Sequence, residues 1–319
     1  MNSFAFVFPG QGSQAVGMLD AWGDHPAVAE VLQEASDALG EDIASLIREG
    51  PKEALALTTN TQPVMLVAGV AAWRAWRADG GAQPALVAGH SLGEYSALVA
   101  AGVLTLAQAA PLVRFRADAM QKAVPVGTGA MAAILGMESV KVIAGCAEVT
   151  AGFGAGSAEV VEAVNFNDPM QTVIAGSKAA VEKACEVLKA SGAKRALPLP
   201  VSAPFHSSLM KPAAEALREK LASVEFATPS IPVLNNIDVA VETDPARIRD
   251  ALVRQAAGPV RWVESVQALR AREVTAIVEC GPGRVLAGMA KRIAPDLAAA
   301  SVYDPATLAD TQTLLSTPS

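Results

Sequence analysis

The sequence predicts an α/β fold in which helices cover both faces of a mostly parallel sheet. Three short, largely apolar runs, at residues 4–8, 85–88 and 275–279, are typical of strands buried on both faces. Helical patterns separate these runs, and strands that alternate with helices indicate a parallel sheet. The middle of the chain follows a different order, from which we expect a smaller unit inserted between the two halves of a larger one.

The composition excludes several classes of protein. The 319 residues are 51% hydrophobic and 18% charged, as in a globular chain long enough for two domains. The formal net charge of −7 argues against nucleic acid as a main partner. Three cysteines without framework spacing indicate reduced thiols, and the longest apolar run, residues 64–73, is too short to span a membrane. We therefore expect a cytoplasmic monomer that does not contact a membrane.

The first predicted strand, residues 4–8, ends in the loop Pro9-Gly10-Gln11-Gly12. Two glycines in this loop allow its backbone to approach a ligand closely. A phosphate-binding loop is excluded, because the Gly-Lys-Ser/Thr ending is missing. Helical spacing of apolar residues then predicts helices within residues 27–78 and, after the second strand, at residues 105–123.

The second strand leads into Gly89-His90-Ser91-Leu92-Gly93, and a helix-forming run follows. A strand, a Gly-x-Ser-x-Gly turn and a helix are together typical of the nucleophile elbow of α/β-hydrolase-like enzymes. Glycines flank the serine because a side chain at either position would collide with the tight turn. An ordinary strand-to-helix loop is the alternative interpretation of this segment by itself.

Residues 127–198 are predicted to form the inserted small domain. Their order is strand, helix, two strands, helix and strand, which is the ferredoxin-like unit. Asn167-Asp168-Pro169 provides a strong turn signal between the two middle strands. The α/β-hydrolase-like domain would then comprise residues 1–126 and 199–304. We expect residues 305–319 to be a loosely held C-terminal tail.

After the insert, the chain is expected to complete the large domain. The pattern predicts a helix at residues 211–221, a strand at 231–235 and helices at 245–256 and 260–271, followed by the last strand. Ligands of parallel sheets bind at the carboxyl ends of the strands, where Gln11 and Ser91 are expected to lie.

A serine nucleophile requires a general base, because its hydroxyl is almost fully protonated at neutral pH. Of the three histidines, His25 lies in a surface helical stretch and His90 points away from its neighbour across the turn, although it could contact a ligand. His206, between a proline-rich loop and a helix, is the favoured base. No acidic residue between the serine and His206 follows a large-domain strand convincingly, so a backbone carbonyl is expected to orient the histidine.

Several segments of the chain resemble one known family. Residues 8–14, 89–95, 165–167, 206–212 and 252–255, together with the arginine before Met120, look like the malonyl-CoA:acyl carrier protein transacylases. The similarity extends in order from residue 4 to about residue 290. The acyltransferase domains of polyketide synthases are similar as well.

The resemblance implies roles for individual residues. Ser91 would be the acylated nucleophile, and His206 its general base and acid. The backbone N–H groups of Gln11 and Leu92 would bind the oxyanion. Arg116, rather than Arg114, would pair with the malonyl carboxylate, which a planar guanidinium can bind through two parallel hydrogen bonds.

The resemblance also implies the remaining substrate site. The backbone carbonyl of Gln255 would orient His206. Phe205 stands where simple bacterial members often have serine, and in polyketide synthases this phenylalanine accompanies a preference for malonyl over methylmalonyl. Such a pocket discriminates by only ~1–3 kcal/mol. The other residues assigned to the substrate site are His90, Asn165 and Met120.

The implied reaction transfers malonyl from coenzyme A to Ser91 and then to the phosphopantetheine thiol of an acyl carrier protein. The carrier protein would be a transient partner, and the coenzyme A thioester is a substrate, so no metal or redox cofactor is implied. A serine hydrolase or thioesterase is the alternative, because it shares the elbow and the histidine but does not need Arg116. A catalytically idle binding module is disfavoured by the presence of the whole set of site residues.

Overall fold

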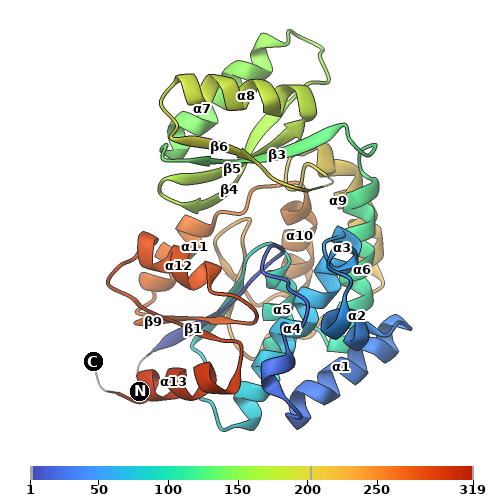
Figure 1. Ribbon diagram of the computed structural model, residues 1–319, viewed down its shortest axis with the longest axis vertical. Helices are drawn as coiled ribbons and strands as arrows, with labels where there is room; N and C mark the ends of the chain where they lie inside the picture. The colour runs from blue at the N-terminus through green and yellow to red at the C-terminus, as the bar shows by residue number, and fades with distance from the viewer. Residues whose placement is uncertain (1–2, 202, 318–319) are drawn as a thin grey trace.

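The protein is built around two β-sheets (Figure 1). The computed structural model describes residues 3–201 and 203–317. The larger sheet has the strand order β10-β9-β1-β2-β7-β8, and its neighbouring strands are parallel except for β7 and β8. The predicted α/β fold with a parallel sheet is therefore confirmed. The strands of this sheet are β1 (Phe4–Phe8), β2 (Leu86–Gly89), β7 (Val233–Leu234), β8 (Val241–Glu242), β9 (Ala276–Cys280) and β10 (Ala298–Val302).

Strand β1 lies in the interior of this sheet, and all five of its residues are buried. Its side chains alternate between two hydrophobic clusters, with Phe6 packed against Trp76 on one face and Val7 in the cluster of Trp262 on the other. Burial on both faces explains why the run is apolar without alternation. The register pairs Phe8 with Gly89, so the loops that follow β1 and β2 emerge side by side.

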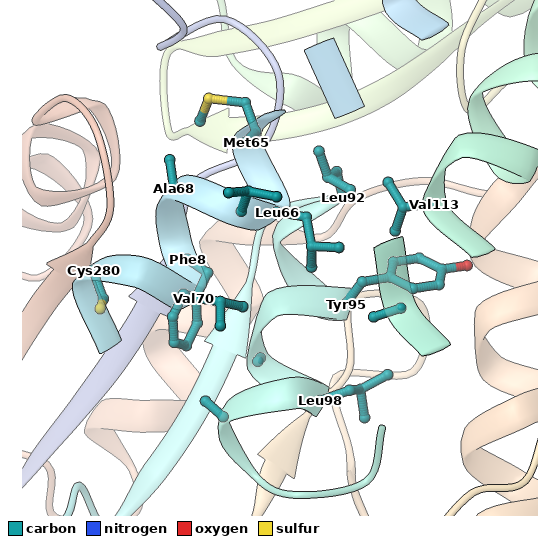
Figure 2. Close-up of a cluster of buried hydrophobic side chains, with 14 of the residues drawn as sticks. Phe8, Met65, Leu66, Ala68, Val70, Leu92, Tyr95, Leu98, Val113 and Cys280 are labelled. Atoms are coloured by element: carbon teal, nitrogen blue, oxygen red, sulfur yellow. The ribbon is translucent and has the colours of Figure 1, made fainter. Parts of the chain in front are cut away.

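Helices cover both faces of the large sheet, as Figure 1 shows. The central helix α4 (Thr58–Ala78) is buried along most of its length. Figure 2 shows how it contributes Met65, Leu66 and Val70 to a cluster that also holds Phe8 and Tyr95. The other helices of this unit are α1 (Pro26–Leu39), α2 (Ile43–Glu49), α3 (Lys52–Leu55), α5 (Gly93–Ala100), α6 (Leu106–Lys122), α9 (Lys211–Ala222), α10 (Pro245–Ala256), α11 (Trp262–Arg270) and α12 (Val285–Ile293), with 3-10 turns at Asp20–Trp22 and Ser208–Met210.

The second sheet is antiparallel, with the order β4-β5-β3-β6, and lies above the carboxyl ends of the large sheet (Figure 1). Along the chain its elements follow the predicted order of strand, helix, two strands, helix and strand. Successive residues of β3 point to opposite faces of this sheet. Ile134 belongs to the hydrophobic cluster under the helices of the small unit, whereas Ala133 belongs to the main core. The elements are β3 (Gly129–Leu135), α7 (Ser139–Gly152), β4 (Val161–Asp168), β5 (Gln171–Ser177), α8 (Lys178–Ala190) and β6 (Arg195–Pro198).

Strand β4 fastens the small unit to the large one. The backbone N–H of Phe166 donates to the carbonyl of Val260, 3.0 Å away, and the N–H of Val260 donates to the carbonyl of Val164 at 2.8 Å. The guanidinium of Arg292, on α12, forms an ion pair with the largely buried Asp168 at 2.8 Å. These contacts hold β4 next to the carboxyl ends of the large sheet.

The expectation of a loosely held C-terminal tail at residues 305–319 is wrong for residues 305–316, and residues 318 and 319 lie outside the described part of the chain. Residues 298–302 form β10, and helix α13 (Pro305–Ser316) packs on it through the buried Leu308, Thr311 and Leu315. The Asp304 side chain caps the helix by accepting from the N–H of Thr307 at 2.7 Å. Strand β10 escaped prediction because its sequence is mostly alanine, which lacks the β-branched and aromatic residues typical of strands.

Within residues 3–201 and 203–317, none of the helices combines the length and apolarity that a membrane crossing requires.

Helix α13 offers a direct test of its contribution to stability. Leu308 is 3% exposed and Leu314 is 39% exposed on the same helix. We expect Leu308→Ala to lower the free energy of unfolding by about 2–4 kcal/mol, because it leaves a cavity, and Leu314→Ala to lower it by less than about 1 kcal/mol. Urea unfolding of both variants measures this. Equal values for the two would contradict the packing of α13 on the core.

Candidate active site

Ser91 lies on a sharp turn between β2 and α5, where the sequence predicts an elbow. Its φ of 53° is in the left-handed region, which residues with a side chain rarely adopt. The flanking glycines are required by space, since a Cβ at Gly89 would lie 1.9 Å from the backbone of Gly93. A Cβ at Gly93 would lie 2.0 Å from the carbonyl oxygen of Phe8. The turn therefore presents the Ser91 hydroxyl at the carboxyl end of the sheet.

His206 is correctly placed to act as the base for Ser91. The Ser91 hydroxyl lies 2.7 Å from Nε2 of His206, and Nδ1 of the same ring lies 3.0 Å from the backbone carbonyl of Gln255. Because a carbonyl only accepts, Nδ1 carries the proton and Nε2 is free to accept the serine proton. Burial lowers the pKa of His206 to about 3, and the charge of Arg116 acts in the same direction.

Arg116 comes from α6 and places its guanidinium beside the serine. One terminal nitrogen donates to the Ser91 hydroxyl at 3.2 Å and to Oε1 of Gln255 at 3.0 Å. The other donates to Oε1 of Gln62 at 2.6 Å, and the guanidinium carbon lies 5.5 Å from the centre of the Tyr95 ring. Burial lowers the pKa of Arg116 from its ordinary value.

The charge of Arg116 has no directly bound counter-ion among the described residues, and the acid that acts on it electrostatically is the buried Glu94. Arg116 is 1% exposed, and it forms no ion pair with any residue that the structure describes. Its Nε also has no hydrogen-bond partner among these residues. A buried, unpaired cation is unfavourable, so this position favours an anionic ligand.

Gln11 and Leu92 line the same cavity as Ser91 and carry backbone N–H groups without a partner among the described residues. Phe8 and Gly89 are paired at the ends of β1 and β2. Gln11 lies three residues after Phe8, and Leu92 lies three residues after Gly89, so the two loops that carry them start side by side. Neither the N–H of Gln11 nor that of Leu92 donates to another residue within the described ranges. Free N–H groups at this place can bind the oxyanion that forms when a serine attacks an acyl carbonyl.

These groups line a cavity of about 570 Å³ between the large and small units. Ser91, His206, Arg116, Gln11 and Leu92 all contribute to its wall. The predicted residues His90, Asn165, Phe205 and Met120 also line it, whereas Gln255 lies beneath the wall. Apolar side chains from both units extend the wall, among them Met131, Val173, Leu199, Val285 and Met289.

His90 turns away from Ser91 and contacts the small unit. Its Nε2 lies 2.8 Å from Oδ1 of Asn167, and its ring packs 5.5 Å, centre to centre, from that of Trp262. Burial lowers the pKa of His90. The ring of His90 is thus held by Asn167, which was not among the predicted site residues. Oδ1 of Asn165 is buried without a partner among the described residues and can accept a hydrogen bond from a ligand.

The sequence prediction did not find several buried residues that hold the site. Asn236 accepts a hydrogen bond from the N–H of Ser91 at 2.7 Å, and its own N–H donates to Glu94 at 2.9 Å. The pair Asn235-Asn236 lies at the end of the predicted strand at residues 231–235, and Glu94 is an acid within an apolar helix; these two signals could have revealed them. Gln62 carried no such signal, and Asn167 was noted only as part of the turn at residues 167–169 and of the segment 165–167 that resembles the family.

The described residues contain no group of three or more His, Cys, Asp or Glu side chains suited to a metal ion.

Comparison with known proteins agrees with this geometry. The acyl transferase domain family matches residues 5–307. The chain belongs to this family. A malonyl CoA-acyl carrier protein transacylase of Escherichia coli strain K12 is 53% identical over 310 residues, which is 97% of this chain and 98% of the relative. The resemblance stated from the motifs is thus confirmed.

Solved structures support the same relationship. An acyl-carrier-protein S-malonyltransferase from Burkholderia pseudomallei 1710b has a TM-score of 0.94 and 64% identity, covering 98% of this chain and 99% of that one. A malonyl-transacylase solved with a type II polyketide synthase acyl-carrier protein has a TM-score of 0.94 and 50% identity, with 98% and 99% covered. The protein thus shares the α/β fold of these acyltransferases.

The low pKa of His206 predicts how the reactivity of Ser91 depends on pH. A histidine is a base only above its pKa, so His206 stays active at pH values where an ordinary histidine is protonated. Between pH 8 and pH 5 we expect the labelling rate of Ser91 by an uncharged fluorophosphonate to fall less than about threefold, whereas a pKa of 6.5 would cause a loss of about 30-fold.

Mass spectrometry of the intact protein measures this labelling. Burial raises the pKa of Glu94 to about 7, so Glu94→Gln serves as the control that removes its titration. A loss with its midpoint near pH 6.5 in both proteins would contradict the neutral, buried His206.

Proposed function

We propose that this protein transfers a malonyl group from malonyl-CoA to the phosphopantetheine thiol of an acyl carrier protein, through a malonyl ester on Ser91. The observation that carries the proposal is the guanidinium of Arg116, buried, without an ion pair in the described structure and 3.2 Å from the Ser91 hydroxyl. A cation at this distance favours an acyl group that ends in a carboxylate. A simple serine hydrolase has no need of it.

The first half-reaction loads the serine. Oγ of Ser91 attacks the thioester carbonyl of malonyl-CoA while its proton moves to Nε2 of His206. The N–H groups of Gln11 and Leu92 bind the oxyanion of the tetrahedral intermediate. The carbon–sulfur bond then breaks, and coenzyme A leaves as a thiol with the proton that His206 held.

The second half-reaction reverses these roles. His206 accepts the proton of the phosphopantetheine thiol, and the thiolate sulfur attacks the malonyl ester. The bond to Oγ breaks, and Ser91 recovers its proton from His206. This ping-pong sequence requires an ester that survives between the two substrates. The chemistry proposed here uses no metal or redox cofactor.

The acyl pocket also suggests which acyl groups fit. Phe205 is 8% exposed and lines the cavity just before His206. In the proposed malonyl ester, a ring at this place would fill the space that an α-methyl group needs. Met120 lines the cavity together with Arg116, and its sulfur accepts from Nε2 of Gln62 at 3.9 Å. We propose that this pocket accepts malonyl in preference to methylmalonyl.

The domain organisation proposed here is an α/β-hydrolase-like unit, residues 1–126 and from 199 onward, with a ferredoxin-like insert at 127–198. The strand order β4-β5-β3-β6 and the antiparallel pairing of its neighbours support the insert. A carrier protein as partner is supported by the related malonyl-transacylase solved with one. A cytoplasmic location and a monomeric state remain predictions.

The proposal predicts a covalent intermediate. Incubated with malonyl-CoA and no acceptor, the protein should gain the mass of one malonyl group on Ser91, because the ester waits for a thiol. Peptide mass spectrometry locates the group, and Ser91→Ala is the control. Rapid release of free malonate would instead indicate a hydrolase, and no label on the wild type would indicate an idle module.

Arg116 is expected to select the acyl group. We expect Arg116→Ala to reduce kcat/KM for malonyl-CoA by about 100-fold or more, because a charged hydrogen-bonded pair is lost, and to raise acetyl transfer or hydrolysis. Arg114→Ala is the matched control: Arg114 lies on the same helix but pairs with Glu41 and bonds to Asn60. Unchanged malonyl selectivity in the Arg116 variant would remove the proposed carboxylate role.

A further inference from the structure

A buried network of polar side chains lies directly beneath the Ser91 turn. Glu94, Asn236 and Gln255 form it, and each is at most 2% exposed. They come from three separate parts of the large unit: helix α5, the turn after β7 and the last residues of α10. Buried polar groups are costly unless they are satisfied, so a network like this fixes the segments that it joins.

Asn236 holds both ends of the turn. Its Oδ1 accepts from the N–H of Ser91 at 2.7 Å, and its Nδ2 donates to the carbonyl of Gly89 at 2.6 Å. The amide oxygen and the amide nitrogen of Asn236 are thereby matched to the N–H of Ser91 and the carbonyl of Gly89, the backbone groups on either side of His90. These bonds secure the left-handed backbone of Ser91, which is unfavourable for a residue with a Cβ.

Gln255 connects the three groups that the reaction uses. Its backbone carbonyl faces His206, its Oε1 accepts from Arg116, and its Nε2 donates to the carbonyl of Ser91 at 3.1 Å. The same Nε2 donates to Oε2 of Glu94 at 2.9 Å. A displacement of this one side chain would therefore move the arginine as well as the serine.

Glu94 joins the two amides. Its Oε2 accepts from the N–H of Asn236 and from Nε2 of Gln255, both at 2.9 Å. The charged groups that act on it are Arg116, on α6, which lowers its pKa, and Asp238, in the turn after β7, which raises it. Burial is the largest effect and raises the pKa of Glu94 to about 7. The two hydrogen bonds that Glu94 accepts fix its carboxyl group between Asn236 and Gln255.

We propose that Asn236 and Glu94 are positioning residues for the acyl transfer, a role that rests on the proposed function. Asn236 holds the backbone of Ser91 in its attacking conformation. Glu94 holds Asn236 and Gln255, so that the serine, the histidine and the arginine keep one geometry. Neither residue lines the cavity, so they act on the rate of the chemical step rather than on substrate binding.

The first test replaces Asn236. We expect Asn236→Ala to lower kcat for malonyl-Ser91 formation by about 10- to 100-fold, the range for two lost hydrogen bonds, while KM for malonyl-CoA changes less than about threefold. Labelling of Ser91 by a fluorophosphonate should slow to a similar degree, because it needs the same serine geometry but no malonyl site.

Asn235 supplies the matched control. It is also buried, and its Oδ1 accepts from the N–H of Asp238 at 2.8 Å, but within the described structure it forms no hydrogen bond with the Ser91 turn. We expect Asn235→Ala to lower the midpoint of thermal unfolding while kcat and the labelling rate stay within about twofold of the wild type. If the two variants lose labelling rate equally, the loss is a general effect of the turn after β7 and the positioning role is wrong.

The second test compares two single substitutions of Glu94. Glu94→Gln keeps an oxygen that can accept both hydrogen bonds, so it should retain the labelling rate within about threefold, whereas Glu94→Ala should lose about tenfold or more. Equal rates for Glu94→Gln and Glu94→Ala would contradict the role.

These readouts separate the two proposals. If the wild type labels with fluorophosphonate but forms no malonyl ester, the proposed function fails. In that case the fluorophosphonate rates of the Asn236 and Glu94 variants still test whether these residues position Ser91. If the wild type forms the ester and Asn236→Ala forms it at the wild-type rate, only the positioning role is overturned.

Discussion

The constraint on which the rest of the structure depends is the left-handed backbone of Ser91 at the junction of β2 and α5. It is possible only because the neighbouring glycines allow α5 to pass within contact distance of the end of β1. That close approach places the Gln11 loop beside the turn, since Phe8 and Gly89 are paired in register. Hydrogen bonds from Asn236 then secure the strained conformation. The nucleophile, the free N–H groups and the start of the helix thus result from one local packing requirement.

The charge of Arg116 organises the polar half of the site. Its hydrogen-bond partners are neutral: the amide oxygens of Gln62 and Gln255 and the hydroxyl of Ser91. They orient the guanidinium without cancelling its charge, so its positive potential acts on the cavity. The same potential helps to lower the pKa of His206, which keeps the imidazole neutral and able to accept a proton. A single buried cation therefore favours an anionic acyl group and also prepares the base that loads it.

The sequence predicted those features of the fold and the site that depend on residues close together in the chain. Ser91 was found because the glycine spacing around it is a steric requirement of the turn, and His206 because two other histidines could be set aside. Asn236 and Glu94 were missed because their partners lie far along the chain; Asn236 meets Ser91 across 145 positions. The asparagine pair and the acid in an apolar helix mark these residues as unusual, but neither signal indicates which distant residue each one contacts. The last strand and α13 were missed for a different reason: the alanines of β10 carry no strand pattern, and Leu308, Thr311 and Leu315 become buried only when the C-terminal segment packs beside β9.

The absence of an acid beside His206 follows from the needs of the arginine. In an ordinary serine hydrolase, a carboxylate accepts from Nδ1 of the histidine. Here that acceptor is the backbone carbonyl of Gln255, the same residue whose side-chain oxygen accepts from Arg116. A carboxylate at this place would lie within reach of the guanidinium and would form an ion pair with it, since a charged acceptor binds a cation more strongly than an amide does. The arginine would then be neutralised before substrate arrived. A carbonyl orients the imidazole through its dipole alone and leaves the cation free for the carboxylate that we propose it binds.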